Sequence, residues 1–180
     1  ISTPDLIVAN AGIGINGAAG KNTNENIEFA NNLMFGGPIR LIEHYLPKMK
    51  ERKSGRIVII SSIGALIPMP KSAIYAAVKS GIYAYGVSLN EELRNDNISV
   101  TVSLPGYVQT NIHKRSGLEH LTKQIPSWMW VSSEQVVKET EIASIKGYSK
   151  VIPGMLYRVA SIFFNLKISK FIWKLMNGRK

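Results

Sequence analysis

Apolar residues follow two patterns along the chain, short runs typical of strands and longer stretches with helical spacing. The run Ile57–Ile60 contains no polar residue and is rich in β-branched side chains, which is typical of a strand buried on both faces of a parallel sheet. The other strand-like runs are Leu6–Val8 and Ile98–Leu104, and helical stretches run from about Ile27 to Arg52, from Ser72 to about Arg94 and from Ser132 to about Ile145. Alternation of strands and helices predicts an α/β fold with a parallel sheet.

Residues 56–81, RIVIISSIGALIPMPKSAIYAAVKSG, carry the candidate chemistry. Here an apolar run ends at a serine pair, a Pro-rich loop follows, and a helix with Ser72 as its predicted N-cap carries Tyr75 and Lys79. Catalytic groups of parallel sheets gather at the carboxyl ends of the strands. Because Tyr75 and Lys79 are four residues apart, a helix places them on one face.

That spacing has a chemical meaning. A phenol has a pKa of about 10, and a lysine ammonium beside it favours the phenolate, so we expect Lys79 to lower the pKa of Tyr75. Tyr75 would then be an acid and base, and Ser62 at the strand end could hold a substrate oxygen. With seven tyrosines and fifteen lysines, the chain could contain such a pair by chance, and a surface contact on the helix is the plain alternative.

Four motifs in order resemble those of classical short-chain dehydrogenases/reductases. They are VANAGIG (Val8–Gly14), GRIVIISS (Gly55–Ser62), the Tyr75 and Lys79 pair, and LPGYVQT (Leu104–Thr110). The resemblance runs from Asp5 to about Val137 and implies NAD(P)-dependent interconversion of an alcohol and a carbonyl. It implies that Ser62, Tyr75 and Lys79 are catalytic and that the cofactor, NAD or NADP, is bound by Asn10, Ala11, Gly12, Tyr75, Lys79, Pro105, Gly106 and Thr110.

The resemblance also implies a doubly wound, Rossmann-like parallel sheet. Relative to the family, the chain begins at the fourth strand, and no Gly-x-Gly-x-x-Gly turn leads directly into a helix. We therefore expect residues 1–154 to be the C-terminal part of such a domain, lacking the N-terminal nucleotide-binding half. Leu6, Ile7 and Val8 would then form an exposed edge strand without half of its cover.

The first long helix is expected to kink at Gly36-Gly37-Pro38, because Pro38 cannot donate to the preceding turn. In the family this helix carries an asparagine that completes a catalytic tetrad. Counting back from the proline positions, its slot falls on Met34. Either Asn31 or Asn32 serves instead through a shifted helix start, or this chain lacks that member, and the spacing favours the second alternative.

The C-terminal third is predicted to contact apolar partners. Residues 107–131, where the family has its substrate loop, include Trp128 and Trp130, which favour either a lid over a hydrophobic alcohol or ketone or a place in the core. Residues 155–180 read as a basic amphipathic helix, which would lie in a membrane interface or dock on the protein. Charges interrupt its apolar clusters too often for a membrane span.

The formal charge of +10 is concentrated near the C-terminus, since residues 142–180 contain eight Lys or Arg and no Asp or Glu. The remainder is nearly neutral, which argues against nucleic acid as a partner. Without cysteine and with three scattered histidines, no metal site is indicated. We expect a cytoplasmic location with peripheral membrane association, and a homo-oligomer in the full-length form.

Two other classes of function compete with the enzyme. The first is a non-catalytic binding protein of the same fold, supported by Met34 and by the missing nucleotide-binding half. The second is a membrane-surface module that acts through the basic tail. The choice between NAD and NADP, the substrate and the direction of the reaction cannot be derived from these residues.

Overall fold

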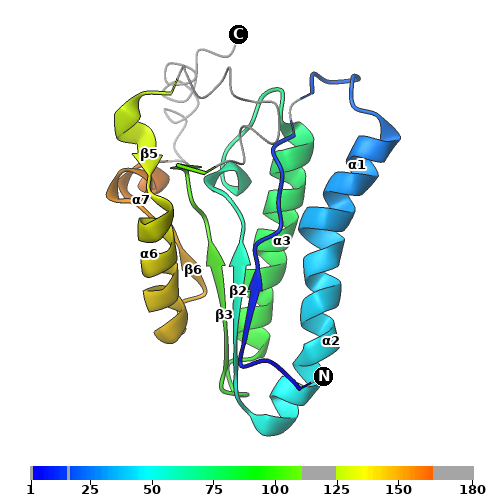
Figure 1. Ribbon diagram of the computed structural model, residues 1–180, viewed down its shortest axis with the longest axis vertical. Helices are drawn as coiled ribbons and strands as arrows, with labels where there is room; N and C mark the ends of the chain where they lie inside the picture. Colours follow the sequence, from blue (N-terminus) through cyan, green and yellow to red (C-terminus); the bar gives the residue numbers. More distant parts are fainter. Residues whose placement is uncertain (1, 16, 111–124, 164–180) are drawn as a thin grey trace.

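The computed structural model describes residues 2–15, 17–110 and 125–163, and a parallel sheet lies at its centre (Figure 1). Across this four-stranded sheet the order is β1 (Leu6–Ala9), β2 (Gly55–Ile60), β3 (Ile98–Ser103) and β6 (Lys150–Val151). β1 and β3 both pair with β2, and β6 pairs with the end of β3. The parallel sheet predicted from the sequence is confirmed, and the carboxyl ends of its strands lie along one edge.

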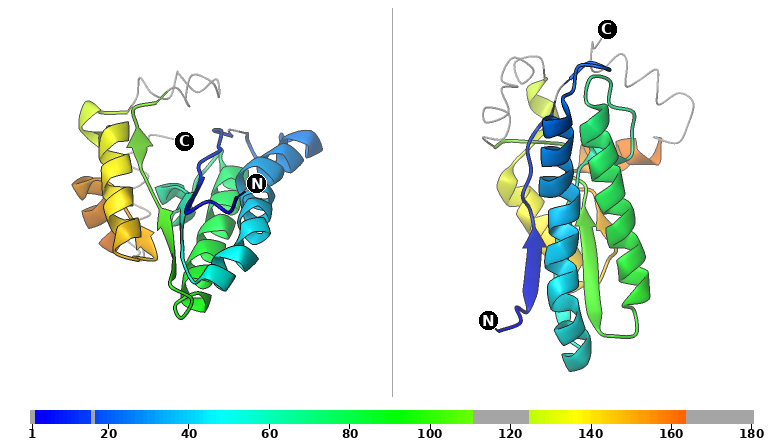
Figure 2. Two further views of the ribbon diagram at one scale, coloured as in Figure 1. Left: turned by 60° about the horizontal axis from the view of Figure 1, so that its bottom comes forward. Right: turned by 90° about the vertical axis from the view of Figure 1, so that its right-hand side faces the viewer.

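Helices cover the sheet on both faces, as in a Rossmann-like fold (Figure 2). On one face lie α1 (Asn24–Asn31), α2 (Gly37–Arg52) and α3 (Ala73–Glu92), and on the other lies α6 (Ser133–Ile145). The main core lies between the sheet and the first group of helices. Its buried members include Ile7, Ile42, Met49, Ile57, Ile59, Ile82, Val100 and Val102.

Helix α3 lies directly on β3 because a glycine faces the strand. A Cβ atom at Gly86 would lie only 2.4 Å from Cγ2 of Val102 and 3.0 Å from Cδ1 of Ile59. Helix α3 therefore packs closely on the sheet at this position. This close contact determines the distance between the strand ends and the first turn of α3, which carries functional side chains.

The opposite face of β3 is polar although it is buried beneath α6. Every second residue of the strand there has a hydroxyl group, and each hydroxyl is hydrogen-bonded to α6 or to the loop that follows it. The bonds are Ser99 Oγ to the Ser144 carbonyl at 3.2 Å, Thr101 Oγ1 to the Tyr148 carbonyl at 2.6 Å, and Ser103 Oγ with Thr140 Oγ1 at 2.7 Å. Buried polar groups need such partners, so α6 is held by specific bonds as well as by apolar contact.

The predicted interruption of the first long helix takes the form of a π-helical turn, Asn32–Gly36, between α1 and α2. Pro38 has no amide hydrogen to donate to the carbonyl of Met34. The Gly37 amide donates to the carbonyl of Asn32, five residues back. The helix thus accommodates the proline by taking in an extra residue.

The starts of the later helices depart in part from expectation. Ser132 caps α6 as an N-cap residue should, accepting from the Gln135 amide at 3.1 Å, and the Gln135 side chain donates to Glu139. Ser72 does occupy the N-cap position of α3, but the prediction that its hydroxyl satisfies a helix amide is wrong. Ser72 has a φ of −138° and a ψ of 34°, outside the extended conformation that typical N-caps adopt.

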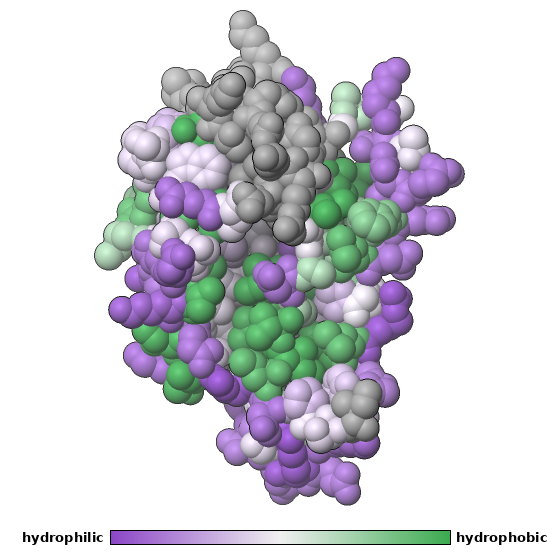
Figure 3. Space-filling model, viewed as in Figure 1, coloured by the Kyte–Doolittle hydropathy of each residue, from purple (hydrophilic) through white to green (hydrophobic). Residues whose placement is uncertain are grey.

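Strand β1 is the outermost strand of the described sheet, and its two faces differ. Ile7 is 4% exposed beneath α2, whereas Val8, on the face that α6 does not reach, is 50% exposed. Figure 3 shows apolar surface where Figure 1 draws β1 and β2. The face of β1 that carries Val8 is therefore exposed, as expected, whereas Ile7 on the other face is buried, contrary to expectation.

The segment after β3 forms a small second sheet and a short helix. β4 (Tyr107–Val108) pairs in parallel with β5 (Trp130–Val131), which follows a single 3₁₀ turn, Ser127–Met129. Helix α7 (Met155–Ile162) begins where the predicted C-terminal helix begins. The rest of that prediction, 164–180, and the middle of the predicted substrate loop, 111–124, lie outside the described residues. In the part described, no helix is long and apolar enough to cross a membrane.

Candidate active site

The serine pair at the end of β2 divides into an inward and an outward residue. Ser61 is buried, donates its hydroxyl to the Lys79 carbonyl at 2.8 Å and donates its amide to the Ser103 carbonyl at 2.8 Å. Ser62 is half-buried and caps a 3₁₀ turn, Ile63–Ala65, accepting from the Gly64 amide at 3.1 Å. Ser61 therefore ties α3 to the strand ends, and Ser62 is left as the candidate for substrate contact.

Tyr75 lies in the first turn of α3, directly opposite Ser62. Burial raises the pKa of the Tyr75 phenol, and a hydrogen bond with Ser62 acts in the opposite direction. A Cβ atom at Gly64 would lie 3.4 Å from Oγ of Ser62 and 3.5 Å from Cε1 of Tyr75, so the glycine lines the same small space. The two residues that the sequence placed together do meet.

Lys79 lies one turn further along α3, and it is 5% exposed. Its Nζ donates to the carbonyl of Ile60 at 2.9 Å and lies 5.9 Å from the centre of the Tyr75 ring. Burial lowers the pKa of Lys79 to about 8. The ammonium is thus held by the end of β2, close to the phenol without being hydrogen-bonded to it.

This geometry corrects one expectation. The sequence predicted that Lys79 would lower the pKa of Tyr75, whereas the pKa of Tyr75 is raised. The physical reason is that loss of water around the phenol is the largest effect, and that Nζ of Lys79 points to Ile60. Tyr75 is therefore a protonated phenol at neutral pH in this structure.

Met34 is the neighbour of Lys79 across the loop after β1. A Cβ atom at Gly12 would lie 3.7 Å from Nζ of Lys79 and 3.8 Å from Sδ of Met34. Met34 is 1% exposed, whereas Asn31 and Asn32 are exposed to solvent. Of the three residues considered for the position of the family's asparagine, Met34 is the one buried near Lys79.

Apart from Tyr75 and Lys79 of α3, the residues expected to bind a cofactor come from the loops after β1 and β3. Asn10 and Ala11 are exposed beyond β1, and Gly12 is half-buried beside Lys79. Pro105 is buried and accepts the Ile63 amide at 2.9 Å, which joins its loop to the serine segment. Gly106 precedes β4 and Thr110 lies exposed two residues after it, so these residues surround the carboxyl ends of β1, β2 and β3.

Sequence reasoning passed over two features near this site. Residues 12–17, GIGING, match the letters of a Gly-x-Gly-x-x-Gly turn directly after β1, but α1 begins only at Asn24, so no helix N-terminus meets these glycines. Tyr157 of α7 also reaches the Pro105-Gly106 loop. Its distance along the chain from every motif left no signal that could have found it.

A cavity of about 280 Å³ opens at the outer side of β1, away from the catalytic candidates. Its lining is mainly apolar and comes from the end of β1 and the junction of α1 and α2. The residues are Val8, Ala9, Asn10, Ala11, Asn32, Leu33, Gly37, Pro38 and Leu41. Ser62, Tyr75 and Lys79 do not line it, so the chemistry and this cavity are separate features that share the Asn10 loop.

Comparison with known proteins supplies the family. The sequence profile described as short chain dehydrogenase matches residues 2–120, a span that includes Ser62, Tyr75 and Lys79. The chain belongs to the short chain dehydrogenase family. Dehydrogenase/reductase SDR family member 7B of Rattus norvegicus is 38% identical over 108 residues, which are 60% of this chain and 33% of the rat protein. The 3-ketodihydrosphingosine reductase of Bacteroides thetaiotaomicron is 32% identical over 120 residues, which are 67% of this chain and 45% of that protein.

Two solved structures share the fold. A short-chain dehydrogenase from Sphingobium yanoikuyae in complex with NADPH has a TM-score of 0.77 at 23% identity, covering 98% of this chain and 66% of that one. A gluconate 5-dehydrogenase from Burkholderia cenocepacia, in complex with NADP and tartrate, has a TM-score of 0.75 at 16% identity, covering 88% and 66%. The Rossmann-like fold is thus confirmed. The chain spans a third to somewhat under half the length of the two curated relatives.

Proposed function

We propose that the protein is an NAD(P)-dependent oxidoreductase that interconverts an alcohol and a carbonyl, with Tyr75 as the acid and base. The observation that carries this proposal is the convergence of Ser62, Tyr75 and Lys79 at the end of β2, where Ser62 and Tyr75 line the same small space beside Gly64. Membership of the short chain dehydrogenase family supports it. The names of the relatives, a dehydrogenase/reductase and a ketone reductase, point to the same chemistry.

The residues present fit the ribose side of a nicotinamide cofactor. An ammonium has three donors, and the Ile60 carbonyl takes one, so Lys79 can also bind sugar hydroxyls. Gly12 has no Cβ atom to occupy the space in front of Nζ of Lys79 and Sδ of Met34. The solved relatives carry NADPH or NADP, which supports NAD or NADP as the cofactor here. A bound cofactor would supply or accept the hydride.

Tyr75 and Ser62 would then act on the substrate oxygen, Tyr75 by exchanging a proton with it and Ser62 by binding it. In the reductive direction the Tyr75 phenol gives its proton to the carbonyl oxygen as the carbon receives hydride, and in oxidation the phenolate takes that proton back. The raised pKa of Tyr75 keeps the phenol protonated at neutral pH, which suits the reductive step. Ser62, which lines the same small space as Tyr75, is placed to hold the same oxygen.

A hydrophobic alcohol or ketone is the proposed substrate class. Trp128 is exposed, so it takes no part in the core, and Trp130 packs its ring 5.8 Å from that of Tyr107. Aromatic side chains that border the carboxyl edge favour an apolar substrate body. The exposure of Trp128 supports a place in a lid over the substrate for this residue, and for Trp130 both alternatives stay open.

Turnover in the complete protein tests the proposal. Oxidation of NADH and NADPH is followed with a panel of apolar ketones, comparing wild type with Tyr75→Phe and with the control Tyr148→Phe, whose side chain is exposed. Tyr75→Phe should abolish turnover while the affinity for NAD(P)H stays nearly unchanged, and the control should match wild type. Turnover of Tyr75→Phe within a few-fold of wild type would exclude Tyr75 as the acid and base. A wild type that binds cofactor but never turns over would favour a non-catalytic binding protein, for which Met34 is the structural argument.

A second function is favoured by the surface of α7. Met155, Val159, Ile162 and Phe163 are exposed and share one face of this helix. The chain from residue 142 onward carries basic but no acidic residues. We propose that this apolar face, with the basic C-terminal sequence, contacts the surface of an anionic membrane.

A further inference from the structure

Tyr157, on α7, joins two segments that lie far from it in the sequence. It is 4% exposed, its hydroxyl donates to the Met129 carbonyl at 2.7 Å, and the same oxygen accepts the Tyr107 amide at 3.1 Å. Tyr107 belongs to β4 and Met129 directly precedes β5. One phenol therefore bridges the two strands of the small sheet.

The ring of Tyr157 also fills the space beside Gly106. A Cβ atom at Gly106 would lie 2.1 Å from Cζ of Tyr157 and within 2.4 Å of two further ring carbons. No side chain other than the hydrogen of glycine fits between the loop and the ring. The backbone of the Pro105-Gly106 turn therefore rests directly on Tyr157.

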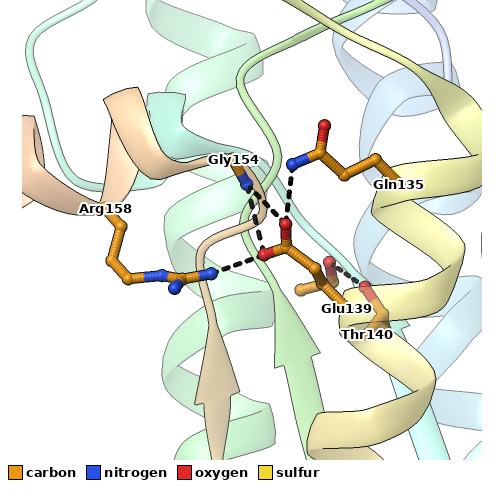
Figure 4. Close-up of polar contacts among 6 residues, drawn as sticks. Gln135, Glu139, Thr140, Gly154 and Arg158 are labelled. Atoms are coloured by element: carbon orange, nitrogen blue, oxygen red, sulfur yellow. Dashed lines mark hydrogen bonds and ion pairs between the residues drawn. The ribbon is translucent and has the colours of Figure 1, made fainter.

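A polar cluster on α6 fixes the start of α7, and hence the place of Tyr157 (Figure 4). The carboxylate of Glu139 accepts the Gly154 amide at 3.3 Å and Nε2 of Gln135 at 2.8 Å, and it forms an ion pair with Arg158. Gly154 has a φ of +89°, a conformation that favours glycine, at the turn where β6 gives way to α7. Arg158 and Tyr157 are adjacent, so the cluster anchors the turn of helix that carries the phenol.

We propose that Tyr157 is a positioning residue for the cofactor, holding Gly106–Thr110 in the place from which it meets the nicotinamide. The inference rests on the proposed function, because that function gives this loop its ligand. Tyr157 acts through the Tyr107 amide and the Gly106 backbone and does not itself touch the reacting atoms. The phenol serves as a hydrogen-bonding bridge and not as an acid, since burial raises its pKa to about 12.

A role in packing alone predicts a different result from a role in positioning. If Tyr157 only filled space, removing its hydroxyl would lower thermal stability slightly and leave the affinity for cofactor unchanged. If it positions the loop, the same change removes the bond between the Tyr107 amide and the Tyr157 hydroxyl and weakens cofactor binding selectively. Tyr157→Phe separates the two, because it keeps the ring against Gly106 and removes only the bridge.

The experiment measures the dissociation constants of NADH and NADPH by fluorescence titration of the complete protein, together with the Michaelis constants and turnover numbers. In Tyr157→Phe we expect the dissociation and Michaelis constants of the cofactor to rise about five- to tenfold, which corresponds to losing one or two ordinary hydrogen bonds. The turnover number should stay within about threefold of wild type. Tyr148→Phe is the matched control, since its side chain is exposed, and it should match wild type.

Amide hydrogen exchange gives a readout that needs no activity. The Tyr107 amide should exchange faster in Tyr157→Phe, whereas the Gln109 amide, bonded to the Val131 carbonyl at 3.0 Å, should be little affected. Unchanged exchange at Tyr107 together with an unchanged dissociation constant would overturn the positioning role. Wild type that binds cofactor without turnover would overturn the proposed reaction and leave this inference testable by titration. Wild type that binds neither NADH nor NADPH would overturn both.

A double-mutant cycle tests the contact of the ring with Gly106. Gly106→Ala should weaken cofactor binding because the new methyl group collides with the Tyr157 ring. In a Tyr157→Ala background the collision is absent, so Gly106→Ala should add little further loss. Equal losses in the two backgrounds would show that Gly106 acts independently of Tyr157.

Discussion

The ammonium nitrogen of Lys79 lies 2.9 Å from the Ile60 carbonyl oxygen and 5.9 Å from the centre of the Tyr75 ring. The end of β2 therefore holds this buried charge, and the phenol faces Ser62 across the small space beside Gly64. In this arrangement the strand end and the first two turns of α3 position one another. Changes to Lys79 should consequently alter the stability of the fold as well as its chemistry.

The buried ammonium predicts a characteristic dependence of stability on pH. Burial lowers the pKa of Lys79 from 10.5 to about 8, so between these values the unfolded chain keeps a proton that the folded chain releases. The cost of burying the charge is fully present below pH 8 and disappears as the pH rises toward 10.5. The contribution of Lys79 to the free energy of unfolding should thus become more favourable by roughly 2 kcal/mol between pH 8 and pH 10.

Denaturant unfolding of wild type and Lys79→Met at both pH values measures this contribution. The variant keeps an unbranched apolar chain and removes the titrating group, so the tyrosines that titrate above pH 10 affect both proteins alike. Parallel pH dependences of the two proteins would contradict the lowered pKa of Lys79.

Because position 34 is a methionine, we expect a turnover number below the maximum for this site, and we expect one substitution at this position to raise it. Its thioether has no donor and accepts only weakly, so it cannot bind a water molecule beside Lys79 as an amide could. Met34→Asn in the complete protein should raise the turnover number several-fold with little change in the Michaelis constant, because such a group acts mainly in the transition state.

Three other variants serve as controls for position 34. Met34→Leu conserves volume and apolarity, so it should match wild type. Asn31→Ala and Asn32→Ala should also be nearly neutral, since both side chains are exposed. If Met34→Asn is neutral while Asn31→Ala or Asn32→Ala cripples turnover, one of these asparagines serves the site and Met34 does not.

A side chain at position 86 should lower the free energy of unfolding for steric reasons, and a second mutation at position 102 should remove this cost. Gly86→Ala places a methyl group 2.4 Å from Cγ2 of Val102, so it should lower the free energy of unfolding by about 1–2 kcal/mol despite the better helix propensity of alanine. In a Val102→Ala background the colliding atom is absent, and Gly86→Ala should be neutral or stabilising. Unfolding of the four proteins in urea gives the coupling energy directly. A coupling near zero would show that α3 can move away from β3 at little cost.

The exposed face of α7 predicts binding to anionic vesicles that is sensitive to salt. Wild type should sediment with vesicles containing phosphatidylserine and be released at high ionic strength, because salt screens exposed charges. Replacing Met155, Val159 and Ile162 with glutamine should abolish sedimentation. The matched control replaces Val137 and Ile145 of α6, which are also exposed, and should still sediment. Equal recovery of wild type in the supernatant with and without vesicles would exclude the membrane contact.

The parts of the site that follow local geometry could be predicted from the sequence. Tyr75 and Lys79 share a face because a helix repeats every 3.6 residues, and Ser62 lies opposite because the strand ends where the serine pair begins. Met34 was found by counting back along the helix to the position at which the family resemblance places an asparagine. The positions of Ser62, Tyr75 and Lys79 followed from the period of one element and from the rule that strand ends share an edge, whereas their catalytic roles and the position of Met34 came from the family resemblance.

The parts that depend on how elements pack could not be predicted. The alternation of Val100 and Val102 with Ser99, Thr101 and Ser103 would ordinarily indicate a strand with one face in solvent, yet the hydroxyl face is buried because α6 supplies acceptors for it. The bond from Lys79 to Ile60 depends on the depth at which α3 lies on the sheet. Tyr157 meets Gly106 through contacts between segments some fifty residues apart, which no local pattern reveals.

Because of the π-helical turn at Asn32–Gly36, the geometry of this site depends on the number of residues in the segment as well as on their identity. Each residue of an α-helix advances the face by about 100°, so the extra residue of the turn sets the rotational phase of α1 relative to α2. Deleting one residue there would restore continuous α-helical geometry and turn Ala30, which is fully buried, away from the core. Substitutions within these five positions keep the phase, whereas a single deletion loses it, so this segment can vary in composition far more freely than in length.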